Sequence, residues 1–164
     1  MIRVAIVTVS DSVANGTRED RSGPQLRERA EELGWSVISQ EVVPDEIDRI
    51  ASQLMQLADS GVANVILTTG GTGVAARDVT PEASRKVIER EIPGLGELMR
   101  AEGLKATPFA ALSRSLAGVR GCTLIVNLPG SPKGAVESLD AIAKLVPHIV
   151  DLMEGRTQHA DVPH

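Results

Sequence analysis

The sequence predicts a single α/β domain with a mostly parallel β-sheet that helices cover on both faces. Short β-branched segments alternate with amphipathic segments, so the N-terminal half reads β, α, β, α, β, α. Such alternation implies right-handed crossovers between parallel strands. The chain has 164 residues, 42% of them apolar and 24% charged, which is typical of one well-cored globular domain.

In the N-terminal half, strands are expected at residues 3–10, 37–43 and 65–69, where apolar and β-branched residues are concentrated. A helix should begin near Ser22 and end at Gly34, and a second should span residues 46–60. The polar segment 11–22 between the first strand and the first helix is longer than a scaffold connection needs. We expect it to serve function or mobility.

In the C-terminal half, a helix should begin at Thr80 as N-cap with Pro81 in its first turn. A further amphipathic segment follows Pro93 and Gly94. Two strands, 113–119 and 123–128, are expected to form an antiparallel hairpin at one edge of the sheet.

The last helix carries apolar positions from Leu139 to Val150, and Pro147 should kink or split it. Residues 155–164 lack periodicity and are expected to form a mobile tail, which leaves residues 1–154 as the single domain.

Composition argues against several classes of function. The net charge is −5 and the aromatic residues are Trp35, expected to pack at the start of its strand, and Phe109, so no nucleic-acid partner is expected. The single cysteine, Cys122, cannot form an internal disulfide and is expected to be a buried, inert thiol. No apolar stretch approaches the ~20 residues of a membrane-spanning helix, so we expect no membrane partner and a cytoplasmic location.

A glycine-rich turn follows the strand at 65–69 and contains Gly70, Gly71, Thr72 and Gly73. Its three glycines allow positive φ angles, so that backbone N–H groups turn toward a bound anion. Asp78 lies between this turn and the next helix. Its carboxylate either holds Mg²⁺ against phosphate oxygens or serves as a second cap or an ion-pair partner of Arg77.

Four predicted strands end in polar or glycine-rich turns, and the carboxyl ends of parallel strands share one edge of a sheet. These turns carry Ser10 with Asp11, Pro44 with Asp45, the Gly70 turn, and a Gly130 turn with Ser131. Lys133 opens the helix beside the last turn and is a candidate phosphate ligand. A binding site is therefore expected at this edge.

Dinucleotide binding, nucleophilic catalysis by the protein and zinc chemistry fit the sequence less well. Gly71, Gly73 and Ala76 match the dinucleotide pattern G-x-G-x-x-A, but Pro81 would then disrupt the helix that the pattern requires. No P-loop, G-x-S-x-G motif or zinc-ligand cluster occurs in the sequence. The functional groups that remain are backbone N–H donors, hydroxyls and carboxylates. These groups suit phosphoryl transfer in which the substrate supplies the nucleophile.

Several ordered motifs resemble the molybdopterin-binding family, which includes bacterial molybdopterin adenylyltransferases. They are TTGGTG at 68–73, RDVTPEA at 77–83, GLGE at 94–97 and NLPGSPKG at 127–134. The resemblance implies a three-layer α/β/α sandwich, commonly a homotrimer, that binds ATP, Mg²⁺ and molybdopterin. Such a protein transfers AMP to the terminal phosphate of molybdopterin, releases pyrophosphate and hands its product over for molybdate insertion.

By this resemblance, the catalytic and Mg²⁺-binding aspartates are Asp45 and Asp78. The nucleotide and pterin contacts are carried over onto Ser10, Asp11, Gly70, Gly71, Thr72, Gly73, Gly130 and Ser131. Ser12 stands where the family usually has arginine, and Val74 with Ala75 replaces a proline-containing pair.

Two alternatives stay open within the same superfamily. One is a pterin-binding paralogue without adenylylating activity, against which the retained aspartate pair argues. The other is a nucleotide-processing protein of the competence-damage type, although we expect a single domain here and such proteins usually carry a second one.

Overall fold

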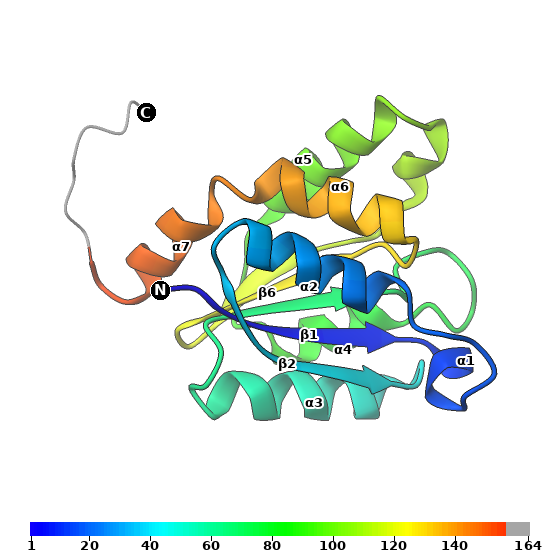
Figure 1. Cartoon of the computed structure of the whole chain (residues 1–164), viewed down its shortest axis with the longest axis horizontal. Helices are drawn as coiled ribbons and strands as arrows, with labels where there is room; N and C mark the ends of the chain where they lie inside the picture. The colour runs from blue at the N-terminus through cyan, green and yellow to red at the C-terminus, as the bar shows by residue number, and fades with distance from the viewer. Residues whose placement is uncertain (157–164) are drawn as a thin grey trace.

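The chain folds around a six-stranded sheet whose strand order is β2-β1-β3-β6-β5-β4. The computed structural model describes residues 1–156 (Figure 1). The strands are β1 (Arg3–Val9), β2 (Ser36–Val43), β3 (Val65–Thr69), β4 (Arg90–Glu91), β5 (Ala117–Arg120) and β6 (Thr123–Leu128). Strands β2, β1, β3 and β6 are parallel, whereas β5 runs antiparallel to both its neighbours. The predicted parallel sheet with an antiparallel edge element is confirmed.

Helices cover both faces of the sheet and give the three layers that the resemblance implied (Figure 1). One layer contains α2 (Ser22–Glu32), α5 (Pro93–Leu104), α6 (Pro132–Ile142) and α7 (Val146–Met153). The opposite layer contains α3 (Ile47–Asp59) and α4 (Thr80–Val87). A short α1 (Asp11–Ala14) and a 3₁₀ helix, η1 (Pro108–Leu112), lie in the connections.

The core is divided by the sheet because successive strand side chains point to opposite faces. In β1, Val4 and Ile6 pack under α2 and α6, whereas Ala5 and Val7 pack against α3. All four side chains have no exposed surface. Burial on both faces explains why this strand is a continuous apolar run rather than an alternating one.

The structure corrects several expected boundaries. The hairpin strand β5 begins at Ala117 rather than Ser113, and α1 lies inside the segment expected to be a loop. Strand β4 and helix η1 were not predicted, since a two-residue strand and a single 3₁₀ turn carry no periodic pattern. Pro147 lies in the first turn of α7, so the final helix is split as predicted.

The start of α4 also differs from the prediction. Val79, not Thr80, is the N-cap residue, and it forms no side-chain cap. The Thr80 hydroxyl instead donates to the Gly70 carbonyl at 2.9 Å, and its backbone N–H donates to the Gly71 carbonyl at 3.1 Å. Thr80 therefore fixes the glycine turn rather than the helix end.

The prediction that Cys122 is buried is wrong, and the prediction that Trp35 packs at the start of its strand is confirmed. Trp35 is buried just before β2. Cys122 is exposed because it lies in the β5–β6 turn, outside the apolar run that follows it. Its thiol donates to the Met153 carbonyl at 3.4 Å.

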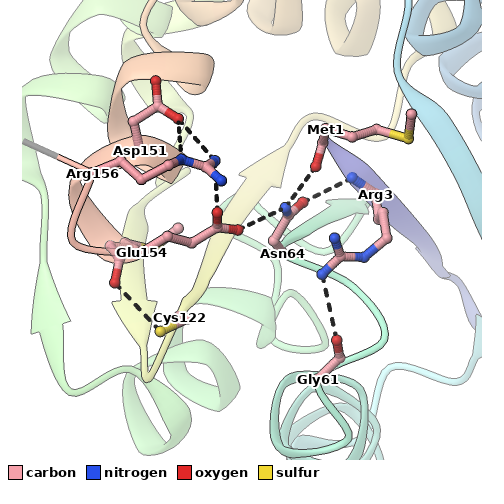
Figure 2. A network of polar contacts seen from close by, with 9 residues as sticks. Met1, Arg3, Gly61, Asn64, Cys122, Asp151, Glu154 and Arg156 are labelled. Atoms are coloured by element: carbon pink, nitrogen blue, oxygen red, sulfur yellow. Dashed lines mark hydrogen bonds and ion pairs between the residues drawn. The ribbon is translucent and has the colours of Figure 1, made fainter. Parts of the chain in front are cut away.

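A polar network at the amino end of the sheet ties the first residues to α7 (Figure 2). The buried Asn64 accepts from the Arg3 backbone N–H at 2.8 Å and donates to the Met1 carbonyl at 2.9 Å. Its amide also reaches Glu154 at 3.4 Å, and Glu154 pairs with Arg156 at 2.6 Å. The rest of the expected tail, residues 157–164, lies outside the described residues.

None of the helices in residues 1–156 is long and apolar enough to cross a membrane.

Candidate active site

The four predicted strand ends meet at one edge of the sheet, because β2, β1, β3 and β6 are adjacent and parallel. This arrangement brings together Ser10 after β1, Asp45 after β2, the Gly70 turn after β3 and the Gly130 turn after β6. The two glycine turns touch, since a Cβ atom on Gly130 would lie 3.2 Å from the Gly70 Cα. Side chains from distant parts of the sequence thus share one site.

The first glycine turn depends on glycine for two different reasons. Gly70 and Gly71 adopt φ angles of 104° and 69°, which other residues rarely adopt. Gly73 has no positive φ angle, contrary to the expectation for all three glycines. Its reason is space, because a Cβ atom there would lie 2.7 Å from a carboxylate oxygen of Asp78 and would displace that side chain.

This turn leaves backbone donors available. Within residues 1–156, the N–H groups of Gly71, Thr72 and Gly73 donate to no protein acceptor. The Thr72 carbonyl, by contrast, accepts from the Arg114 N–H at 2.8 Å, which anchors the turn from behind. The three free N–H groups have the chemistry of an anion-binding turn.

Asp45 and Asp11 are held together by reciprocal hydrogen bonds. The Asp11 N–H donates to Asp45 Oδ2 at 2.8 Å, and the Asp45 N–H donates to Asp11 Oδ1 at 3.0 Å. Burial raises the pKa of the Asp45 carboxyl above its ordinary value, and the nearby charges of Asp11 and Asp78 raise it further. The site therefore holds negative charge in unfavourable surroundings until a cation is close.

Asp11, to which the resemblance assigns a ligand contact, is paired with a cation in this structure. Its carboxylate pairs with the Arg77 guanidinium, with Nη2 at 3.0 Å from Oδ1. The hydrogen bond from Arg77, followed by that from the Asp45 N–H, lowers the pKa of the Asp11 carboxyl. Asp11 thus joins the ends of β1 and β2 to the Arg77 segment.

Asp78 lies at the point where the site divides. Its Oδ2 atom accepts the Ala75 N–H at 2.9 Å, and Arg77, the partner considered for it, pairs with Asp11 instead. Two cavities of about 420 and 360 Å³ meet here. Both are lined by a shared rim consisting of Gly71, Asp78, Gly130 and Ser131.

The two cavities differ in chemistry. The first, the apolar cavity, has a wall of apolar side chains from α5, η1 and the end of β6: Met99, Phe109, Ala110, Leu112 and Pro129. The second, the polar cavity, is lined by hydroxyl and charged groups: Ser10, Arg18, Asp20, Arg21 and Asp45. Volumes of this size accept small organic ligands.

Sequence reasoning missed most of the apolar wall. Phe109 is 75% exposed although it is the one phenylalanine of the chain, and it lies in a 3₁₀ turn without periodicity. The signal in the sequence was a phenylalanine directly after Thr107 and Pro108, outside any periodic apolar pattern. Lys133, which was predicted to contact phosphate, lines neither cavity, and its ammonium lies 3.8 Å from Glu137.

Comparison with known proteins identifies the family of this chain. Residues 5–148 match the family model described as the probable molybdopterin binding domain. A molybdopterin adenylyltransferase of Helicobacter pylori J99 is 43% identical over 94% of this chain and 89% of its own length. The Escherichia coli K12 molybdopterin adenylyltransferase is 37% identical over 94% of this chain and 86% of its own length.

A solved structure shares the whole architecture. The molybdopterin biosynthesis enzyme MoaB from Thermus thermophilus superposes with a TM-score of 0.89 and 52% identity. The match covers 94% of this chain and 98% of that one. On the family match and these relatives, the chain belongs to the molybdopterin-binding domain family.

Proposed function

We propose that this protein is a molybdopterin adenylyltransferase of molybdenum cofactor biosynthesis. The observation that carries the proposal is a site with two unlike cavities that meet at one rim of glycines, Asp78 and Ser131. A reaction that joins two substrates needs such an arrangement. The named activity of the Helicobacter and Escherichia relatives supports the same assignment.

In the proposed reaction, an oxygen of the terminal phosphate of molybdopterin attacks the α-phosphorus of ATP. The bond from this phosphorus to the bridging oxygen of the β-phosphate breaks, and pyrophosphate leaves with that oxygen. The protein positions both reactants and offers the N–H groups of the Gly71 turn to the phosphate oxygens. No protein nucleophile is required.

The residues present fit Mg²⁺ bound jointly with substrate. Asp45 and Asp78 both line the polar cavity, and the charge of Asp78 contributes to the raised pKa of Asp45. Residues 1–156 contain no group of three metal-binding side chains that would form a complete protein cage. Mg²⁺ commonly takes one or two carboxylates and completes its shell with water and phosphate oxygens. When bound, the ion would neutralise phosphate charge.

The direct test is incubation of the purified protein with ATP, Mg²⁺ and molybdopterin. We expect adenylylated molybdopterin and an equal amount of pyrophosphate, measured by chromatography and a coupled pyrophosphate assay. Pterin binding without product from well-folded protein would contradict the proposal and favour the non-catalytic binding paralogue.

We also propose a cytoplasmic homotrimer that passes its product to a molybdate-insertion protein. Exposed apolar side chains on α5 that line neither cavity support a subunit contact: Leu98 and Leu104. Light scattering coupled to size-exclusion chromatography should give three times the chain mass. A monomer at micromolar concentration would contradict the trimer.

A further inference from the structure

Arg114 lies behind the first glycine turn and binds it at several points. Its Nε donates to the Gly73 carbonyl at 2.7 Å, and its Nη2 donates to the Asp78 carbonyl at 2.6 Å. Its backbone N–H donates to the Thr72 carbonyl at 2.8 Å. One side chain therefore holds both ends of segment 73–78.

Glu82 fixes the orientation of this guanidinium. Glu82 lies in the first turn of α4 and forms an ion pair with Arg114 Nη1. The same hydrogen bond lowers the pKa of the Glu82 carboxyl. A planar guanidinium can reach three acceptors from one position, which the ammonium of lysine cannot do with the same geometry.

Arg114 does not reach the ligands directly. It lines neither the apolar nor the polar cavity, but a separate hollow whose other residues come from α4, β4, α5 and segment 113–116. Asp78 lines both cavities, and its carboxylate is held by the Ala75 N–H inside the segment that Arg114 closes. The place of this carboxylate thus depends on the shape of segment 73–78.

We infer that Arg114 is a positioning residue that holds the Asp78 carboxylate at the rim shared by the two cavities. The inference rests on the proposed function, because it gives Asp78 a part in turnover. Glu82 assists by orienting the guanidinium. Displacement of a catalytic group by about 1 Å lowers turnover by roughly 100-fold, so loss of Arg114 should be visible in kcat.

The test is a comparison of Arg114→Ala and Arg114→Lys with Arg120→Ala. Arg120 is a matched control, because it also joins a carboxylate, Asp59, and a carbonyl, that of Val87, but it lies at the other end of the sheet. We expect kcat to fall by about 10- to 100-fold in both Arg114 variants with KM for ATP changing less than about threefold. Arg120→Ala should keep the kcat of the unchanged protein.

A double-mutant cycle with Asp78→Asn separates positioning from general destabilisation. If Arg114 acts through Asp78, then Arg114→Ala adds no further loss once Asp78→Asn is present. Multiplied losses would overturn the inference. If Arg114→Ala folds poorly, Glu82→Gln is the second variant. We expect it to lower kcat two- to fivefold, and this fall should disappear in the Asp78→Asn background. A fall in kcat that persists in that background would also overturn the inference.

The two proposals fail in different ways. Normal turnover by a well-folded Arg114→Ala protein overturns the positioning role and leaves the adenylyltransferase assignment intact. If the unchanged protein makes no product, calorimetric titration of ATP with and without Mg²⁺ replaces turnover in the same cycle. The inference then requires Arg114→Ala to lose the Mg²⁺-dependent gain in affinity as Asp78→Asn does, and retention of that gain overturns it.

Discussion

The two ends of the sheet use polar residues in opposite ways. At the amino end, Asn64 accepts from one backbone group and donates to another, and Glu154 is matched by Arg156. At the carboxyl end, burial and the nearby charges of Asp11 and Asp78 raise the pKa of Asp45. Backbone N–H groups in the adjoining turn have no protein partner within residues 1–156. The polar groups at the amino end bind one another, whereas those at the carboxyl end include charges and N–H donors that could bind a ligand.

This difference indicates where the chain gives up stability for function. Unpaired like charges and positive φ angles are unfavourable in the folded protein and accumulate at functional sites. Closed hydrogen-bond networks of buried groups contribute to stability. Substitutions at the two ends should therefore separate turnover from stability.

The largest expected effect is on turnover at the carboxyl end. Asp78→Asn removes a charge and almost no volume, so kcat should fall by about 10³-fold, while Tm and pterin affinity change little. Steady-state kinetics, thermal melting and pterin titration measure the three quantities. Equal loss of pterin binding and turnover would instead make Asp78 a docking or structural residue.

Gly71→Ala should lower both turnover and stability. The new methyl group would clash with the Thr80 hydroxyl at a position with φ of 69°, at a cost of about 2 to 4 kcal/mol in the free energy of unfolding. Gly121→Ala is the matched control, because Gly121 also has a positive φ but its Cβ would meet open space. It should lose only about 1 kcal/mol and retain full turnover in urea-melt and kinetic measurements.

At the amino end, Asn64→Ala should lower stability without affecting chemistry. The substitution leaves the Arg3 N–H and the Met1 carbonyl without their partner, which costs about 1 to 3 kcal/mol. Urea denaturation measures this loss, and kcat at a temperature well below Tm should stay within about twofold. A tenfold fall in kcat would show that the two ends are not independent.

The smallest expected effect is a gain in thermal stability on substitution of Asp45. Since burial raises the folded-state pKa of Asp45, its ionised form destabilises the folded protein at neutral pH. Asp45→Asn should raise Tm by about 2 °C at pH 7. The gain should shrink as the pH is lowered from 7 toward about 4, because a raised pKa means that the folded protein binds the proton at Asp45 before the unfolded chain does. Melting curves at both pH values test the sign. A gain that is the same at pH 7 and pH 4 would contradict this origin.

The main architecture was predictable because it depends on local patterns. Apolar runs such as 65–67 and the helical face from Ile47 to Leu57 follow from the period of each element, and parallel crossovers then place the strand ends together. The exposure of Cys122 was not predictable, since it depends on the exact residues at which the hairpin turns.

The candidate site was only partly predictable. Asp45, Gly70 and Ser131 follow strands and could be placed by topology, but the Arg114 contacts join residues 36 and 41 positions apart in sequence. Long-range contacts between a charged side chain and backbone carbonyls leave no local pattern. The apolar wall around Phe109 was missed for a related reason, because a single 3₁₀ turn has no repeat to detect.

The contact between the Gly70 and Gly130 turns bears on the ligand selectivity of the two cavities. Where these turns touch, the wall between the two cavities is formed by backbone atoms. Changes of side-chain rotamer cannot move this part of the wall. Substitutions on α5 and η1 can reshape the apolar cavity while this part of the wall stays constant. A substitution there can therefore change which ligand the apolar cavity accepts and leave the shared rim in place.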